Sequence, residues 1–160
     1  MSLEDLRRPF QPVIRRVMHT YWRFSRGLTL GVRGLVIDGE GRVFLVKHSY
    51  VPGWHLPGGG VEVGETMMAA LERELREEGN IELAETPPLH AVYFNRRASP
   101  RDHVALFVIR KFRQTASPKP NREIIGHGFF ALDELPTDAV RATRERIAEV
   151  LDGRVAAEIW

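Results

Sequence analysis

The hydrophobic pattern of the chain changes period several times, and each change indicates a new element. From residue 13 to residue 22 apolar side chains recur at i, i+4 and i+8, which is the period of a helix, and Pro12 suits its first turn. Further along, apolar runs of strand length are bounded by glycines, prolines or polar turns. We predict strands over 28–38, 42–48, 89–95 and 104–112, a helix after the glycines at 58–60, and a closing helix over 138–151.

The order of these elements predicts one α/β domain. The first two strands flank a short turn at 39–41, which favours a β-hairpin, and strands then alternate with helices. A chain of 160 residues without an internal repeat has the length of a single domain with a sizeable core. We therefore divide it into an N-terminal basic, amphipathic helical extension over 1–27, a folded domain over 28–153 and a tail over 154–160.

Three glutamates at the end of the central helix are placed against its stability. Glu74, Glu77 and Glu78 lie at i, i+3 and i+4, so they share one face of one turn and repel each other. They also lie in the last turn, where the helix dipole favours cations. A divalent cation with oxygen ligands would compensate this charge. The alternative is an ordinary solvated face, but this leaves the preceding glycines and the neighbouring Arg73 unexplained.

The apolar residues of the same helix predict how it packs. Met68, Leu71 and Leu75 are spaced i, i+3 and i+7, which places them on one stripe that faces the core. We expect the carboxylate face to be turned away from that stripe.

The stretch from Gly59 to Ile81 resembles the signature of the Nudix hydrolase family, also called MutT-like. That signature is Gly, five residues, Glu, seven residues, Arg-Glu, an aliphatic residue, any residue, Glu-Glu, any residue, Gly and an aliphatic residue. Asn80 departs from it, because it stands where the family has glycine. The position needs a left-handed backbone at the helix end, which asparagine tolerates next best. The matching residues are Gly59, Glu65, Arg73, Glu74, Leu75, Glu77, Glu78 and Ile81.

The resemblance implies the Nudix fold, an α/β/α sandwich with a mixed sheet between helices. It also implies an enzyme that hydrolyses a diphosphate bond in a nucleoside diphosphate linked to another group, with Mg²⁺ or Mn²⁺ as cofactor. The substrate would be a small nucleotide-type molecule, whose base, sugar and linked group stay open. A less favoured alternative is a catalytically silent nucleotide-binding or regulatory module, which would be expected to have lost one of the three glutamates.

The resemblance further implies which atoms bind the metal. Its ligands would be the side chains of Glu74, Glu77 and Glu78 and the backbone carbonyl of Gly58, just before the first glycine of the signature. Arg73 is interpreted as the residue that orients these carboxylates.

One further carboxylate is a candidate for catalysis. Glu123 follows a long, proline-marked loop over 114–122, and resembled proteins often carry an extra carboxylate about there that binds metal or accepts a proton. Either Glu74 or Glu123 could take the proton of the attacking water. The alternative for Glu123 is an exposed ion pair with Arg122 or with a nearby lysine.

Three arginines are candidates for binding substrate phosphates, because the planar guanidinium group suits a phosphate. Arg33 is a charged residue inside an otherwise apolar predicted strand, so it either points into the site or lies at an exposed edge. Arg96 and Arg97 lie in a polar loop, where basic residues also serve solubility.

The composition limits the cellular location and the classes of partner that we expect for the protein. Its lack of cysteine excludes disulfides and thiolate metal sites, and no apolar run approaches the ~20 residues of a membrane span. No signal sequence is indicated near Met1, so we expect a cytoplasmic protein. The formal net charge of +2 is too small to favour nucleic acid as a bulk partner.

The N-terminal extension admits three partners for its apolar stripe. We favour packing on the folded domain or on a second subunit, which would make the protein a homodimer. A basic amphipathic helix can also lie on an anionic membrane, and this is the less favoured alternative.

Overall fold

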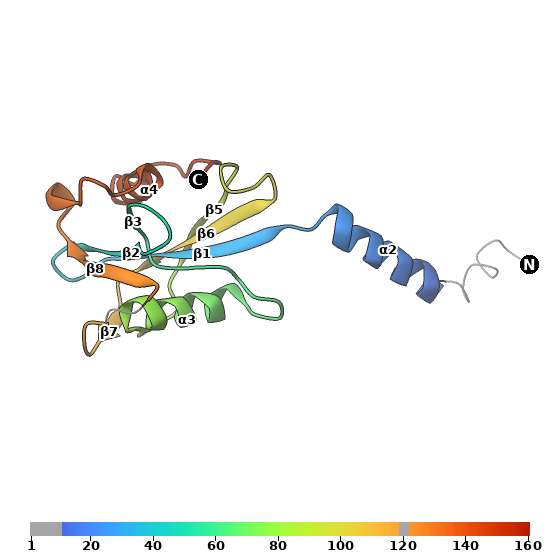
Figure 1. The fold of residues 1–160 in the computed structure, drawn as a ribbon, viewed down its shortest axis with the longest axis horizontal. Helices are drawn as coiled ribbons and strands as arrows, with labels where there is room; N and C mark the ends of the chain where they lie inside the picture. Colours follow the sequence, from blue (N-terminus) through green and yellow to red (C-terminus); the bar gives the residue numbers. More distant parts are fainter. Residues whose placement is uncertain (1–10, 119–121) are drawn as a thin grey trace, which may run out of the picture.

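Helix α3 covers one face of the strands, and helix α4 covers the opposite face (Figure 1). The computed structural model describes residues 11–118 and 122–160, so the first ten residues of the predicted extension and residues 119–121 of the predicted loop lie outside it. The elements are α2 (Gln11–Ser25), β1 (Thr29–Val36), β2 (Val43–His48), β3 (Trp54–His55), α3 (Met67–Gly79), β4 (Ile81–Leu83), β5 (Leu89–Phe94), β6 (Asp102–Ile109), β7 (Phe112–Gln114), β8 (Ile124–Phe130), the 3-10 helix η2 (Leu132–Glu134) and α4 (Arg141–Leu151).

The strands form three small sheets. In the first, of order β1-β6-β5, β1 is parallel to β6 while β5 is antiparallel to it. The second, of order β3-β2-β8, is antiparallel, and so is the short pair of β4 and β7. The predicted α/β fold with a mixed sheet between helices is therefore confirmed.

The predicted hairpin between the first two strands is wrong. β1 runs parallel to β6, from Thr29 opposite Asp102 to Val36 opposite Ile109, whereas β2 pairs with β3 and β8. A single bridge between Ile37 and Val43 joins the two chain segments beside the turn. Both strands carry long buried runs, so each needs apolar neighbours on both faces. This need is met because the strands diverge and belong to different sheets.

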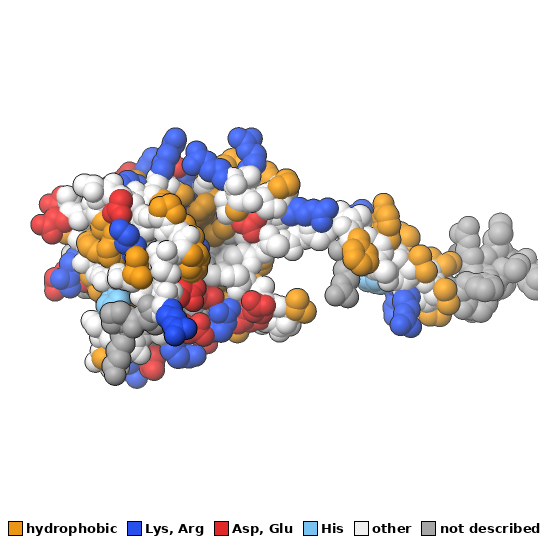
Figure 2. Space-filling model, viewed as in Figure 1, with side chains coloured by type: hydrophobic (Ala, Val, Ile, Leu, Met, Phe, Trp, Pro, Cys, Tyr) orange, Lys and Arg blue, Asp and Glu red, His pale blue; other side chains and the backbone are white. Residues whose placement is uncertain are grey.

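Helix α2 confirms the predicted N-terminal helix, but the described part of the domain leaves its apolar face uncovered. The helix extends away from the domain (Figure 1), and apolar side chains are visible along its surface (Figure 2). Val17, Tyr21 and Phe24 are 61%, 64% and 74% exposed. Packing of this stripe on the chain's own domain is therefore wrong for the described residues. Across those residues no helix is long and apolar enough to span a bilayer.

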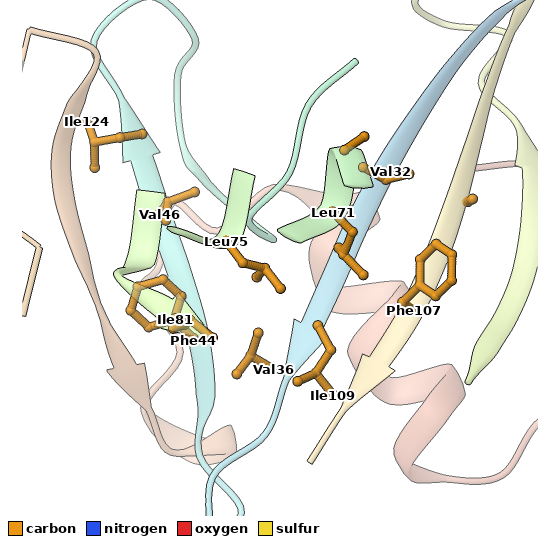
Figure 3. Packing of buried hydrophobic residues seen from close by; sticks show 12 residues of the cluster. Val32, Val36, Phe44, Val46, Leu71, Leu75, Ile81, Phe107, Ile109 and Ile124 are labelled. Atoms are coloured by element: carbon orange, nitrogen blue, oxygen red, sulfur yellow. The ribbon is translucent and has the colours of Figure 1, made fainter. Parts of the chain in front are cut away.

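Alternation along the strands creates two cores, one under each helix. Successive strand residues point to opposite faces, so Val32 and Val36 of β1 face α3 while Leu35 lies in the other core. The core under α3 contains Val32, Val36, Phe44, Val46, Leu71, Leu75, Ile81, Phe107, Ile109 and Ile124 (Figure 3). The core under α4 contains Leu35, Ile37, Val43, Leu45, Leu56, Tyr93, Leu106 and Ile147.

Helix α3 approaches β1 closely because Gly34 has no side chain. A Cβ atom at that position would lie 3.2 Å from Leu75 Cδ2 and 3.4 Å from Leu71 Cδ1. Thr66 caps the start of α3, where its side chain accepts a hydrogen bond of 3.1 Å from the Ala69 amide. These contacts fix the helix, and hence its terminal glutamates, relative to the sheets.

Two predicted boundaries shift for identifiable reasons. The closing helix begins at Arg141 rather than at residue 138, because the preceding residues bond to β3: the Trp54 amide donates to Asp138 O and the Val140 amide to Trp54 O. The strand predicted over 104–112 is divided into β6 and β7, which belong to different sheets.

Asn80 ends α3 in the left-handed conformation that the sequence predicts, with φ 50° and ψ 38°. Its side-chain amide also donates 2.9 Å to Ala116 O. We predict that Asn80→Val destabilises the protein by roughly 1–2 kcal/mol, because a β-branched residue is strained at positive φ. Thermal unfolding measures the effect. Asn80→Gly is the matched control, since it removes the same side chain without strain; equal midpoints for Asn80→Val and the control would contradict the prediction.

Candidate active site

A hollow of about 510 Å³ lies at the C-terminal end of α3. Helix α3 contributes the lining residues that belong to the signature, and the segment that enters β8 contributes the remaining wall. The fold therefore brings Glu123 to the glutamates of the helix, although no helical spacing connects them. The lining residues are Arg73, Glu74, Glu77, Glu78, Glu123 and Ile124.

Glu78 is buried, with 5% of its surface exposed, so the expectation that the carboxylates turn away from the apolar stripe is wrong for this residue. It follows Leu71 by seven positions and Leu75 by three, which puts it at the end of the buried stripe. Its Oε2 accepts a hydrogen bond of 2.7 Å from the Gly58 amide. Its Oε1 lies 3.3 Å from His48 Nε2.

Burial raises the pKa of Glu78 to about 8. The Gly58 amide and the charge of Arg33 lower it, while the charges of Glu74 and Glu123 raise it further. His48 supplies little positive charge to balance the Glu78 carboxylate, because burial and the charge of Arg33 lower the pKa of His48 and favour its neutral form. The protein therefore leaves the anionic form of Glu78 undercompensated.

Arg73 holds two carboxylates at once. Its Nε and Nη2 donate to the two oxygens of Glu65 at 3.0 and 3.1 Å, and its Nη1 donates to Glu74 Oε1 at 2.6 Å. Nη2 also donates 3.1 Å to Gly60 O. These hydrogen bonds lower the pKa of Glu65 and fix the direction of the Glu74 carboxylate.

Two glycines bring the backbone close to the carboxylates. At Gly59 a Cβ atom would lie 2.2 Å from Glu74 Oε1, so the missing side chain makes the room that the Glu74 carboxylate occupies. Gly58 has φ +138°, and a Cβ atom there would lie 2.1 Å from Val32 O. Only glycine fits such a position, which allows the Gly58 amide to reach Glu78.

Arg33 points toward the site rather than to an exposed edge. Its Nη1 donates to Leu56 O at 2.9 Å and to Gly58 O at 2.5 Å. A smaller hollow beside it is lined by Arg33, His48, Tyr50, Val51, His55, Gly58 and Gly59. The guanidinium thus occupies one lone pair of the same Gly58 carbonyl that the sequence suggests as a metal ligand.

Tyr50 connects this smaller hollow with Glu123. Its hydroxyl donates 2.8 Å to Glu123 Oε1. Burial, and then the Glu123 carboxylate, raise the pKa of Tyr50 to about 12, so the hydroxyl keeps its proton at neutral pH. Glu123 itself is exposed at the rim of the carboxylate hollow.

Arg96 and Arg97 are not brought to the carboxylates. They are exposed and line a different hollow, of about 490 Å³, together with residues of α4 and the C-terminal tail. Figure 2 shows basic side chains along the edge of the molecule that carries α4 and the C-terminus. Substrate binding by these two arginines stays a prediction that the geometry of the carboxylates does not favour.

Three side chains of the site, those of Glu65, His48 and Tyr50, were not predicted from the sequence to act in binding or catalysis. Glu65 belongs to the signature spacing, and its position eight residues before Arg73 is the signal that pairs them across the turn. His48 and Tyr50 lie where β2 ends and the next loop begins, and no spacing connects them to the glutamates. Their proximity results from the packing of β2 between β3 and β8.

The donor set suits a hard divalent cation. Carboxylate oxygens prefer Mg²⁺, Mn²⁺ and Ca²⁺ over softer metals. The buried Glu78, with its raised pKa and two further carboxylates acting on it, is the observation that fits a missing positive charge. Within residues 11–118 and 122–160 no three acidic or histidine side chains are already gathered as closely as in a metal-bound site. The carboxylates would therefore have to draw together around an ion.

Comparison with known proteins agrees with this geometry. Residues 27–151 match the model of the NUDIX domain. A MutT-like protein of Streptomyces ambofaciens is 29% identical over 125 residues, which is 78% of each chain. An RNA pyrophosphohydrolase of Halorhodospira halophila is 39% identical over 67 residues, and this match covers 42% of the present chain and 37% of that protein's length.

A solved structure supports the same assignment. The crystal structure of a MutT NUDIX hydrolase from Burkholderia pseudomallei superimposes with a TM-score of 0.64 and 28% sequence identity, and it covers 76% of this chain and 97% of its own. The family match spans most of the chain and includes the glycine turn, α3 and β8, which together build the carboxylate hollow. The chain therefore belongs to the Nudix family and is similar to its MutT-like members.

Proposed function

We propose that the protein is a pyrophosphohydrolase that cleaves a phosphoanhydride bond in a nucleotide derivative, with Mg²⁺ or Mn²⁺ held by the carboxylate hollow. The observation that carries the proposal is the convergence of Glu74, Glu77, Glu78 and Glu123 on one hollow. Carboxylate oxygens gathered in this number attract a hard divalent metal, and a polyphosphate would bind beside them through such a metal.

The three glutamates of α3 would contact the ion from different positions. Glu77 is exposed to the hollow, Glu78 lies at its buried end, and Glu74 is aimed by Arg73. A divalent cation held there would supply charge that neutralises phosphate oxygens and would lower the pKa of a coordinated water. The Gly58 carbonyl can join the ligands through its second lone pair, because Arg33 occupies one.

Glu123 is the better candidate for the proton acceptor. The carboxylate of Glu74 accepts a hydrogen bond of 2.6 Å from Arg73, which fixes its direction and suits it to the role of a metal ligand. Glu123 lies at the exposed rim, where a water molecule has access, and Tyr50 orients it at 2.8 Å. We therefore assign the removal of the water proton to Glu123.

Arg33 is placed to contact a substrate phosphate at the inner edge of the site. Its guanidinium has further N–H groups beyond the one that binds the Leu56 and Gly58 carbonyls. It lines the hollow that adjoins the glycine turn. We expect a small nucleotide with a linked group, and the similarity to an RNA pyrophosphohydrolase makes RNA the competing substrate.

A hydrolysis screen tests the proposal. The purified chain is incubated with nucleoside triphosphates, nucleotide sugars, ADP-ribose, dinucleoside polyphosphates and 5′-triphosphorylated RNA, with Mg²⁺, with Mn²⁺ or with a chelator. We expect release of a nucleoside monophosphate or of pyrophosphate from one class, and no release in the chelator. Nucleotide binding without turnover under every condition would favour a silent binding module instead.

Loss of one metal carboxylate should abolish turnover without unfolding the protein. We predict that Glu77→Gln and Glu78→Gln each lower kcat severely, while thermal stability in the absence of metal stays equal or rises because a repulsion is relieved. For Glu78 the sign follows from its raised pKa: burial disfavours its charged form, so the neutral glutamine gains most above pH 4.5. Full activity in either variant would remove that residue from the metal site.

The space left by Gly59 offers a second test of the carboxylate geometry. We predict that Gly59→Ala lowers kcat at least tenfold, because the new methyl group would overlap Glu74 Oε1 and displace that carboxylate. Gly60→Ala is the matched control, since nothing lies within 4 Å of a Cβ atom there. Steady-state kinetics and thermal unfolding are measured for both. Equal activity of the two variants would show that the position of Glu74 is not critical.

The role of Glu123 is tested by Glu123→Gln, which keeps the shape but removes the base. We predict a fall in kcat of on the order of 10²–10⁴ with little change in KM. Tyr50→Phe removes the orienting hydroxyl and should give a smaller fall in kcat. If Glu123→Gln retains kcat within a few-fold of the unsubstituted protein, Glu74 is the remaining candidate for the base.

A further inference from the structure

Helix α2 presents a continuous apolar face that the described part of the chain does not cover. At about 100° per residue, its large apolar side chains fall within roughly half of the helix circumference. Their exposure is far above that of a packed helix, with Ile14 at 52% and Tyr21 at 64%. The exposed residues of this face are Val13, Ile14, Val17, Met18, Tyr21, Trp22 and Phe24.

The charges of the same segment have one sign. The sequence from residue 11 to residue 27 contains arginines at 15, 16, 23 and 26 and no aspartate or glutamate. At the helical angle, these positions fall together on the side opposite the apolar face. The guanidinium of Arg26 lies 5.4 Å from the centre of the Trp22 ring, at the border between the two faces.

This charge distribution selects among the possible occupants of the face. A second copy of the helix would meet an equally cationic neighbour, and it has no carboxylate to form the flanking ion pairs that stabilise paired helices. A half-circumference apolar face is also wider than the narrow stripe of a two-helix contact. An anionic lipid surface matches both faces, because it takes the apolar side chains among its acyl chains and the arginines among its phosphates.

We propose that α2 binds in the plane of an anionic phospholipid membrane and holds the hydrolase domain at that surface. Tyr21 and Trp22 suit the depth of the headgroups, where an amphipathic ring is favoured. The arginines extend to the lipid phosphates while their stems lie along apolar surface. The carboxylate hollow is formed by α3 and β8, so the domain keeps its own site free when α2 is bound.

Vesicle binding of the full chain tests the proposal. Flotation is measured with vesicles of phosphatidylcholine alone and with vesicles that also contain phosphatidylglycerol, at low and at high salt. We expect binding to the anionic vesicles that weakens as salt rises, with a blue shift of the tryptophan emission that is lost in Trp22→Phe. Absence of binding to anionic vesicles, or equal binding to both kinds, would overturn the proposal.

Two variants of the full chain assign the binding to α2. Ile14→Glu combined with Tyr21→Glu should abolish flotation, while Val92→Glu combined with Val155→Glu, at exposed positions of β5 and of the C-terminal tail, should not change it. Arg15→Gln combined with Arg16→Gln should weaken binding roughly thirtyfold, since each arginine near an anionic surface adds about 1 kcal/mol and two are removed. This second variant keeps the apolar face, so it remains informative if the first one fails to fold.

The oligomeric state distinguishes the remaining alternative. Light scattering of the free protein should give a monomer, or a dimer that the substitutions at Ile14 and Tyr21 leave unchanged. A dimer that these substitutions dissociate, in a protein that does not float with anionic vesicles, would mean that a second copy covers α2. Hydrolysis in solution should be unaltered by the α2 variants.

Discussion

The site depends on negative charge that the protein gathers at one end of α3 and neutralises only in part. Glu78 is buried at the end of α3 beside a histidine whose pKa is lowered, and the charges of Glu74 and Glu123 act on it as well. A carboxylate in such a position loses hydration without gaining a full counter-charge, which costs free energy in the metal-free protein. In the proposed function a divalent cation would make this arrangement favourable, so the same charge that costs free energy would be the source of the affinity for metal.

The rest of the fold holds that charge in place. Buried Leu71 and Leu75 anchor α3 between diverging strands, and Gly34 lets the helix approach β1. The glycine turn before α3 supplies an amide to Glu78 and leaves room for Glu74, while Arg73 ties the turn to the helix through Glu65 and Gly60. These contacts fix the positions of the few residues that line the hollow.

Much of this could be predicted from local sequence, because the relevant information is local. The spacing of the glutamates, the left-handed end at Asn80 and the amphipathic face of α2 are all properties of one helix, and helical periodicity reveals them. The hairpin was predicted wrongly because strand periodicity gives the faces of a strand and not its partners. The spacing of Glu78 to Leu71 places it on the buried stripe of the helix, whereas its carboxyl group suggested an exposed position. In the folded protein the side chain is buried.

Contacts between residues that are distant in the sequence could not be predicted from helical or strand periodicity. Glu123, Tyr50 and His48 reach the glutamates only because β2 and β8 are neighbours and end beside α3. Arg96 and Arg97 resembled phosphate ligands by residue type, and their loop instead lies with α4 and the C-terminal tail. Residue type alone predicts what a side chain can bind, whereas the order of the strands decides where it stands.

The central claim is that undercompensated carboxylates form a metal site, and thermal unfolding in the presence of metal tests it most directly. The unfolding midpoint is measured while Mg²⁺ or Mn²⁺ is titrated into the chelator-treated protein and into Glu78→Gln. We predict a midpoint that rises with metal in the unsubstituted protein, because the ion binds the folded state alone, and that rises little in the variant. An unchanged midpoint in the unsubstituted protein, or equal rises in both, would contradict the account.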